Sequence, residues 1–387
     1  MILAWAALGV LVYAYAGYPL LLLVAGAARR RKKAPEWRGE WPELTIVVPV
    51  HNEAVAIGAT LEALLATDYP ADRRRILVVS DASTDGTDVI VSEYAGRGVR
   101  LLRLPERGGK TAAENAARGQ LAGDIVVNTD ASVRVHPAAI KPLVRALADP
   151  SVGVASGRDV SVAPGTTLAN AGESAYVGYE MWVRDLETQV SGIVGASGCL
   201  YAIRGDLYRE PVPPALSRDF AAALVARERG LRAVSVPEAV CFVPRGASLR
   251  QEYRRKVRTM ARGLATLGAK RHLLDPTRHG AFAWMLASHK LIRWLVPWSA
   301  VLFVVALAAA APDHPLARLG LAAAGAGGLL ALLGWLWPEG RPLPRLVALA
   351  AFGAGGMVAG LHAWLRALAG RRTPVWEPTR RGPMSVA

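Results

Sequence analysis

Residues 44–53 read LTIVVPVHNE, a run of apolar and β-branched residues that ends in polar ones. This pattern is typical of a buried strand, and it recurs along the chain. Similar runs predict strands at residues 44–50, 76–80, 99–104 and 124–128. Helical periodicity lies between them, at residues 53–66, 86–94 and 109–121. Continuous apolar strands that alternate with helices predict a Rossmann-like, mostly parallel α/β sheet with helices on both faces.

The pattern is less regular after residue 152. Strands are expected near residues 153–162, 195–203 and 232–236. Two helices are also expected, at residues 170–190 and 249–267, and the second of them is strongly basic.

Polar and acidic side chains follow the first four predicted strands. In open parallel sheets, ligands bind beyond the carboxyl ends of the strands, so these residues are candidates for binding. They are His51, Glu53, Asp81, Lys110, Asp130 and Ser132, and Pro49 near the end of the first strand is a further candidate. A single pair such as Asp85-Gly86 is equally typical of a turn. Four polar clusters at neighbouring strand ends favour a ligand site instead.

The residue types suggest which ligand this is. The carboxylate of Asp81 can accept hydrogen bonds from a nucleobase or ribose, and Asp130 offers a hard oxygen ligand for Mg²⁺ or Mn²⁺. Lys110 follows two glycines at the start of a predicted helix, which resembles a cradle for an anion. The spacing of a Walker A loop is absent.

Both ends of the chain contain long apolar segments. Residues 1–28 are almost wholly apolar and are followed by Arg29–Lys33, which is the reverse of the order in a signal peptide. We therefore predict a membrane helix at 1–28, a basic linker at 29–43 and a cytoplasmic domain at 44–270.

The C-terminal third predicts further membrane segments. An interfacial helix region is expected at 271–294, because its apolar run contains His289, Lys290 and Arg293. Two or three membrane helices are expected within 295–369, at residues 295–311, 316–337 and, with glycines that weaken it, 347–368. The tail at 370–387 is basic. Three C-terminal crossings would place that tail outside, against the positive-inside rule, so either the last segment is re-entrant or interfacial, or the rule fails locally.

The chain has 387 residues and a formal net charge of +15. Such a charge is typical of nucleic-acid binders, but here the basic runs flank apolar segments, as at Arg250–Arg271. We therefore expect membrane lipid and phosphate as the partners, and no nucleic acid. The two cysteines, Cys199 and Cys241, lack CxxC partners, so reduced thiols are expected.

Seven stretches together resemble the membrane-bound, inverting family 2 glycosyltransferases with a GT-A fold, which include polysaccharide synthases. They run in the order of that family and cover most of the predicted domain. They read TIVVPVHNE, VVSDASTDGT, GGKTAAENAA, VNTDAS, GASGCLYAIR, SRDFAAAL and QEYRRKVR.

The resemblance implies roles for individual residues. Asp81 would contact uracil or ribose, with Glu53 close by. The metal-binding D-x-D motif reads Asp130-Ala131-Ser132, so the second carboxylate is replaced by Ser132. The catalytic base would be Asp219, with Arg218 in the place of a second acid. From the residues alone, Asp219 could equally be an acid at a helix N-terminus.

The Q-x-x-R-W motif of the family corresponds to Gln251-Glu252-Tyr253-Arg254-Arg255. The motif implies contacts with diphosphate and acceptor for Gln251, Arg254, Arg255 and Arg258, which helical spacing places on one face. A helix that faces anionic lipid is the alternative. Since Arg255 replaces the tryptophan on which an acceptor sugar stacks in processive synthases, a lipid-linked or glycan acceptor is favoured.

We therefore expect an inverting hexosyltransferase that uses a nucleotide-sugar, with UDP as the expected nucleotide, and a divalent metal. It is expected in a bacterial-type plasma membrane as a multi-pass protein with a cytoplasmic catalytic domain. Two alternatives stay open. One is a processive exopolysaccharide synthase, and the other is a degenerate membrane partner that binds nucleotide-sugar without transferring it.

Overall fold

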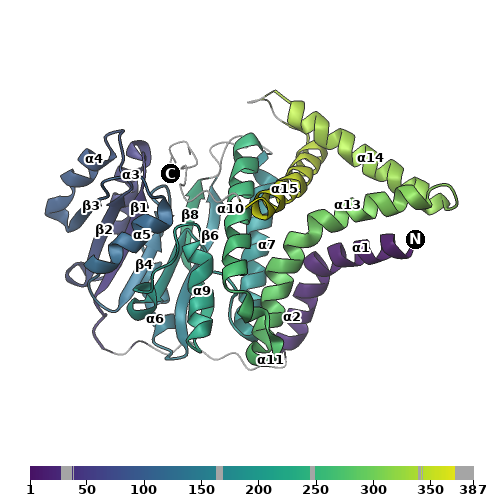
Figure 1. Cartoon of the computed structure of the whole chain (residues 1–387). Helices are drawn as coiled ribbons and strands as arrows, with labels where there is room; N and C mark the ends of the chain where they lie inside the picture. Colours follow the sequence, from purple (N-terminus) through teal and green to yellow (C-terminus); the bar gives the residue numbers. More distant parts are fainter. Residues whose placement is uncertain are drawn as a thin grey trace.

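The predicted strands pair into one eight-stranded mixed sheet in the computed structural model of the protein (Figure 1), in the order β3-β2-β1-β4-β7-β6-β8-β5. The structure describes residues 1–27, 37, 39–162, 169–244, 249–338, 341 and 343–370, without the side chains of residues 169–173. The strands are β1 (Leu44–Val50), β2 (Arg74–Ser80), β3 (Val99–Arg103), β4 (Ile125–Thr129), β5 (Arg134–Val135), β6 (Val152–Val162), β7 (Leu200–Arg204) and β8 (Arg232–Pro244).

The first half of the sheet is parallel, as predicted. β1 lies between β2 and β4, with Leu44 opposite both Arg74 and Ile125. All seven residues of β1 are buried, because alternate side chains pack into two separate cores on the two faces of the sheet. The polar residues that follow β1, β2 and β4 therefore lie along one edge.

The second half of the sheet is mixed, which the sequence pattern did not predict. β7 runs antiparallel to both β4 and β6, whereas β6 and β8 are parallel. β7 also begins at Leu200 and not at residue 195. The preceding Gly195–Gly198 forms a loop, and this loop lines the cavity described below.

Helices cover both faces of the sheet. One core includes side chains of α3 (Ala54–Leu65), α4 (Thr87–Glu93) and α6 (Ile140–Leu147). The other includes side chains of α5 (Lys110–Ala116), α8 (Gly205–Tyr208) and α9 (Arg218–Glu228). The helices α7 (Ala169–Val190) and α10 (Leu249–Ala269) stand between the sheet and the apolar helices (Figure 1). The layered α/β architecture agrees with the predicted fold class.

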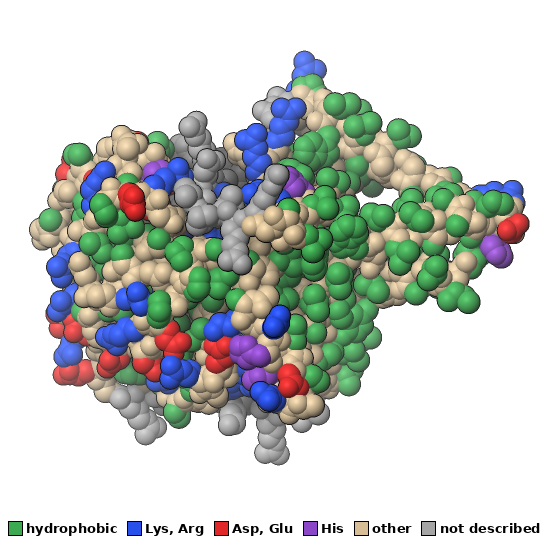
Figure 2. All heavy atoms as spheres, viewed as in Figure 1, with side chains coloured by type: hydrophobic (Ala, Val, Ile, Leu, Met, Phe, Trp, Pro, Cys, Tyr) green, Lys and Arg blue, Asp and Glu red, His purple; other side chains and the backbone are tan. Residues whose placement is uncertain are grey.

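Four helical segments are long and apolar enough to cross a membrane: Ile2–Ala27, Ala281–Ala310, Pro315–Leu336 and Arg345–Leu368. The first contains α1 (Ile2–Val12) and α2 (Tyr18–Ala27), and the others include α13 (Arg293–Ala310), α14 (Pro315–Leu336) and α15 (Arg345–Leu368). α1, α13 and α14 project from the domain (Figure 1), and hydrophobic side chains cover this projection (Figure 2). Leu319 and Leu329 in α14 are 67% and 70% exposed. Such a surface indicates a membrane protein.

The segment at 281–294 is not separate from the membrane helix predicted to start at 295. One helix runs from Ala281 to Ala310, through α12 (Ala281–Leu286), a π-helical turn at Ala287–Ile292 and α13. The charged residues of the segment pack against α7 instead of breaking the helix. A short helix α11 (Pro276–His279) precedes it. Arg29–Lys33 and residues 371–387 of the basic tail lie outside the described residues.

Candidate active site

A cavity of about 380 Å³ opens where the strand ends meet α7, α10 and the helix Ala281–Ala310. Seven of the predicted site residues line it: Glu53, Lys110, Asp130, Ser132, Asp219, Arg255 and Arg258. Two sides of the cavity differ in origin. The strand-end wall comprises Glu53, Lys110, Glu114, Asp130 and Ser132. The membrane-side wall comprises Tyr176, Glu180, Arg184, Lys290 and Trp294.

An ion pair occupies the strand-end wall. Lys110 Nζ lies 2.5 Å from Asp130 Oδ1 and 3.4 Å from the carbonyl oxygen of Gly198. Burial lowers the pKa of Lys110, but the nearby carboxylates of Asp130, Glu114 and Asp219 outweigh burial and raise it above its ordinary value. Lys110 is therefore a permanent cation at neutral pH, placed where a diphosphate would need one.

Asp81 does not line the cavity. It is 1% exposed, and its two carboxylate oxygens accept hydrogen bonds from the backbone N–H groups of Gly108 (2.7 Å) and Gly109 (2.8 Å). The anion held by the two glycines is thus Asp81 itself, which corrects the expectation of a free anion cradle before Lys110. A side chain at Gly108 would meet Ala112 at 2.8 Å, so this loop requires glycine.

His51 and Pro49 lie at the same edge of the sheet, outside the lining of the cavity. His51 is buried, and its Nδ1 lies 2.6 Å from the carbonyl oxygen of Asp81. Pro49 pairs with Val79 inside the parallel ladder. Neither side chain lines the cavity, so direct contact with a nucleotide stays a prediction for both.

Asp219 lies in the first turn of α9 and faces the cavity. Its Oδ1 accepts hydrogen bonds from Ser217 Oγ (2.5 Å) and from the backbone N–H of Phe220 (2.9 Å). Its Oδ2 points toward Gly198, where an added Cβ would lie 2.6 Å away, and it accepts no hydrogen bond from the described residues. One oxygen therefore stabilises the helix start, and the other is available to a ligand.

The neighbouring Arg218 is a structural residue. It is 4% exposed, donates to Asn115 Oδ1 at 2.5 Å, and stacks on the Tyr208 ring with its Cζ 4.4 Å from the ring centroid. A second acid is nevertheless present, because Glu114 of α5 lines the cavity and is 2% exposed. Burial raises the pKa of Glu114. The sequence analysis assigned no role to Glu114.

The basic helix α10 turns a different face to the cavity than the motif implied. Arg255 and Arg258 line the cavity together with Thr259 and Arg262, at helical offsets of zero, three, four and seven. Gln251 and Arg254 are exposed and do not line it. The lining of this cavity therefore does not support phosphate contacts for Gln251 and Arg254.

The membrane-side wall was missed by sequence reasoning. Lys290 and Trp294 come from the helix Ala281–Ala310, and Tyr176, Glu180 and Arg184 come from α7. The only signal was the group of charges within the apolar run at 281–294, which the sequence led us to place at a lipid interface. The structure shows Lys290 of this group at the cavity instead.

The described residues contain no group of three Asp, Glu, His or Cys side chains that could hold a metal ion. The strand-end wall still fits a metal of one kind. Mg²⁺ and Mn²⁺ are often bound by one carboxylate while substrate phosphates and water supply the remaining ligands. Asp130 offers that carboxylate, and the buried Ser132 offers a weaker hydroxyl ligand.

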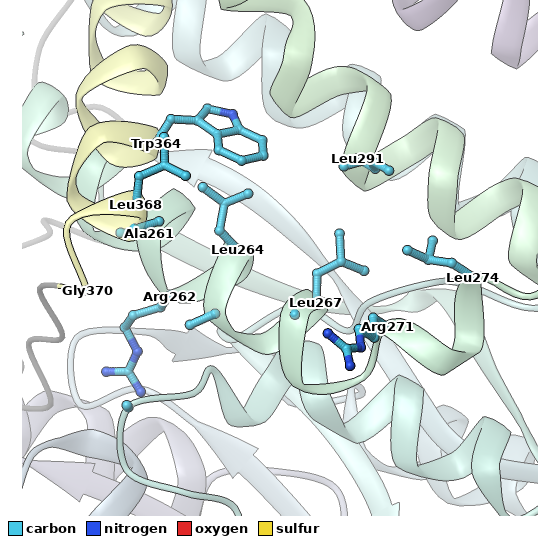
Figure 3. A pocket seen from close by; sticks show the side chains of 14 residues that line it. Ala261, Arg262, Leu264, Leu267, Arg271, Leu274, Leu291, Trp364, Leu368 and Gly370 are labelled. Carbon is cyan, nitrogen blue, oxygen red and sulfur yellow. The ribbon is translucent and has the colours of Figure 1, made fainter.

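Figure 3 shows a second cavity, of about 410 Å³. Its lining is mostly apolar and includes Leu264, Leu267, Leu291, Trp364 and Leu368, whose side chains surround the space in Figure 3. These residues come from α10, α15 and the helix Ala281–Ala310. Arg262 of α10 lines both cavities.

Comparisons with known proteins agree with this geometry. Residues 45–195 match the model of glycosyl transferase family 2. An N-acetylglucosaminyltransferase of Sinorhizobium fredii is 26% identical over 70% of this chain and 73% of its own length. The beta-monoglucosyldiacylglycerol synthase of Synechocystis is 27% identical over 40% of this chain and 33% of its own. The first curated relatives are matched over only 27% to 33% of their own length.

One solved structure resembles nearly the whole chain. It is the mannosyltransferase PcManGT from Pyrobaculum calidifontis, in complex with GDP-Man and Mn²⁺. The similarity covers 96% of this chain and 100% of that one, at 25% identity and a TM-score of 0.71. The family match, the similar architecture and the strand-end site together identify the chain as a family 2 glycosyltransferase with a GT-A fold and apolar helices that could span a membrane.

Proposed function

We propose that the protein is an inverting hexosyltransferase that moves a sugar from a nucleotide-sugar to a lipid-linked or glycan acceptor at the cytoplasmic membrane face. The observation that carries this proposal is the position of Asp219 Oδ2. This oxygen accepts no hydrogen bond from the described residues, and it faces the cavity that also contains Lys110 and Asp130. A proton acceptor therefore lies beside a cationic site for a diphosphate.

The proposed reaction is a single displacement at the anomeric carbon. Asp219 removes the proton of the acceptor hydroxyl as that oxygen attacks, and the sugar–phosphate bond breaks on the opposite side. Lys110, Arg255 and Arg258 hold the departing nucleoside diphosphate, whose negative charge grows in the transition state. A divalent metal bound by Asp130 would neutralise the same phosphates.

The apolar cavity beside the site supports a lipid-linked acceptor. It lies between α10 and two of the apolar helices, and Arg262 lines both this cavity and the active-site cavity. An acyl or prenyl chain could occupy it while the head group reaches Asp219. A uridine nucleotide remains our expectation for the donor, although the relative PcManGT was solved with GDP-Man.

The function is tested by incubating the purified full-length protein with a panel of UDP- and GDP-sugars and measuring nucleoside diphosphate release. In this assay Asp219→Asn should lower the rate by about 100-fold or more, because the general base is removed. Binding of the nucleoside diphosphate should change by less than about twofold, because the base does not hold the donor. A variant with more than about a tenth of the wild-type rate would refute the role of Asp219.

Metal dependence is a separate prediction. Excess chelator should abolish the reaction and Mg²⁺ or Mn²⁺ should restore it, and Asp130→Ala should be inactive with either metal. The reason is that Asp130 is the carboxylate available to the metal on the strand-end wall beside Lys110. Full activity in excess chelator would mean that Lys110 and the arginines neutralise the diphosphate alone.

A further inference from the structure

The membrane-side wall contains two cations that have no hydrogen-bond or ion-pair partner among the described residues. Lys290 and Arg184 both line the active-site cavity, and neither side chain forms a hydrogen bond or an ion pair with any described residue. Nε and Nη1 of Arg184 are buried. The Lys290 ammonium lies over the Phe220 ring, with Nζ 5.4 Å from the ring centroid.

The acids close to these two cations are already engaged. Glu187 Oε1 accepts from the hydroxyl of Tyr18 at 2.6 Å and lies 2.5 Å from Nδ1 of His289. Glu180 is 3.1 Å from His289 Nε2 and pairs with Arg293. Both glutamates are therefore paired with other residues, and neither forms an ion pair with Arg184 or Lys290.

Buried charge without a partner costs free energy, and proteins ordinarily pair or remove it. The strand-end wall does not neutralise Arg184 and Lys290, because its own Lys110 and Asp130 already neutralise each other on the other side of the cavity. Lys290, Arg184 and Asp219 line the same cavity, and the Lys290 ammonium lies over the ring of Phe220, the residue that follows Asp219. An anion bound by Lys290 and Arg184 would thus lie beside the proposed base.

We infer that Arg184 and Lys290 form a second anion subsite, which binds a phosphate group carried by the acceptor. This inference rests on the proposed function, because it names the chemistry of the acceptor. The donor diphosphate binds the strand-end wall, and the acceptor phosphate binds the membrane-side wall, with Asp219 between them. Arginine supplies two parallel N–H donors to a phosphate and the lysine a point charge, a combination that suits this ligand.

The experiment measures binding to the full-length protein in a neutral detergent by isothermal titration calorimetry. Three probes are used: dodecyl phosphate, phenyl phosphate and, as the neutral match, dodecyl glucoside. The variants are Arg184→Gln and Lys290→Met, with Arg100→Gln as a control, because Arg100 is an exposed residue of β3 that does not line the cavity. UDP and GDP are titrated into every variant.

We expect phosphate probes to bind the wild type at least about tenfold more tightly than the glucoside, since each charged hydrogen bond contributes measurably. Each cavity variant should lose about tenfold, Arg100→Gln nothing, and nucleotide binding should be unchanged. Binding of dodecyl phosphate alone would identify a lipid head group, and equal binding of phenyl phosphate a soluble phosphate. Thermal midpoints of the unliganded variants should not fall, because an unpaired charge has been removed.

Two results would overturn the subsite. One is phosphate affinity that is the same in the wild type and both cavity variants, or no higher than for the glucoside. The other is a loss of UDP or GDP binding in the variants that equals the loss for phosphate, since the cations would then belong to the donor. If the wild type bound neither nucleotide, the proposed function would fail, while a phosphate effect confined to Arg184 and Lys290 would still establish the subsite.

Discussion

On the strand-end wall, Lys110 lies 2.5 Å from Asp130 and 3.4 Å from a backbone carbonyl, whereas on the membrane-side wall Arg184 and Lys290 face no carboxylate within ion-pair distance among the described residues. Both walls belong to one cavity and both present cations. The difference lies in what neutralises them in the unliganded protein.

This difference has a consequence for ligand binding. On the strand-end wall an incoming diphosphate must exchange the contact between Lys110 and Asp130 for contacts of its own, and a metal on Asp130 would drive the same exchange. On the membrane-side wall no internal pair has to open. We therefore expect binding to the first wall to depend on metal, and binding to the second to depend on charge alone.

The largest effect is expected at Gly198, which lines the cavity next to Asp219. A Cβ there would lie 2.6 Å from Asp219 Oδ2 and would displace the carboxylate. Gly198→Ala should therefore lower kcat by about 100-fold, the usual cost of a misplaced catalytic group, with nucleotide affinity unchanged. The measurement is steady-state kinetics together with UDP and GDP titrations.

Gly96→Ala is the matched control, because an added Cβ at Gly96 meets no atom within 4 Å. The control should behave as wild type. A Gly198→Ala variant with wild-type kcat would show that Asp219 can move without loss, and the division of the cavity into two walls around that carboxylate would lose its basis.

Much of the strand-end wall could be predicted from sequence. Apolar strands that end in polar residues place those residues at one edge, and Glu53, Lys110, Asp130 and Ser132 do line the cavity. The rule does not say which side chain turns back into the protein. Asp81 follows the same pattern, but its carboxylate accepts hydrogen bonds from the backbone N–H groups of Gly108 and Gly109. These contacts depend on the conformation of the loop that contains the two glycines.

The membrane-side wall could not be predicted in this way. Its residues come from α7 and from the helix Ala281–Ala310, which are about a hundred residues apart in the chain and meet only in the tertiary structure. A lysine inside an apolar segment has the same local signature whether it faces lipid head groups or a cavity. Helical spacing likewise groups residues into faces but does not fix which face points inward, as Arg254 and Arg258 illustrate.

The second prediction compares these two arginines of α10, which the proposed function places near the donor phosphates or away from them. Arg258 lines the cavity and Arg254 is exposed, although both are arginines on α10. A bidentate contact between Arg258 and a phosphate is reproduced poorly by lysine, so Arg258→Lys should lower turnover about tenfold, or roughly 1.4 kcal/mol. Arg254→Lys should be silent in the same kinetic assay. Equal effects of the two substitutions would indicate that α10 contributes only general positive charge.

The smallest effect concerns Glu114, the buried carboxyl beside Lys110. Burial, together with the charges of Asp219 and Asp130, raises its pKa in the folded protein above the ordinary value of 4.5, although Lys110 and Arg218 oppose this. Below pH 4.5 the group is protonated in both the folded and the unfolded chain, so its contribution to stability is fully present. As the pH rises through the raised pKa, ionisation is more costly in the folded chain, and that contribution is lost.

Glu114→Gln replaces the carboxyl with a neutral group of similar shape, and its stability should lack this pH dependence. The thermal midpoint of the wild type in detergent should therefore fall relative to that of Glu114→Gln as the pH is raised from 4.5 toward neutrality, by a few degrees. Because Glu114 and Asp130 both contribute to the raised pKa of Lys110, the variant should also weaken the hold of the strand-end wall on its lysine. The membrane-side wall should be unaffected, so dodecyl phosphate affinity should match that of the wild type. A midpoint difference that stays constant across this pH range would show that Glu114 ionises normally, and that Lys110 is neutralised by Asp130 without its help.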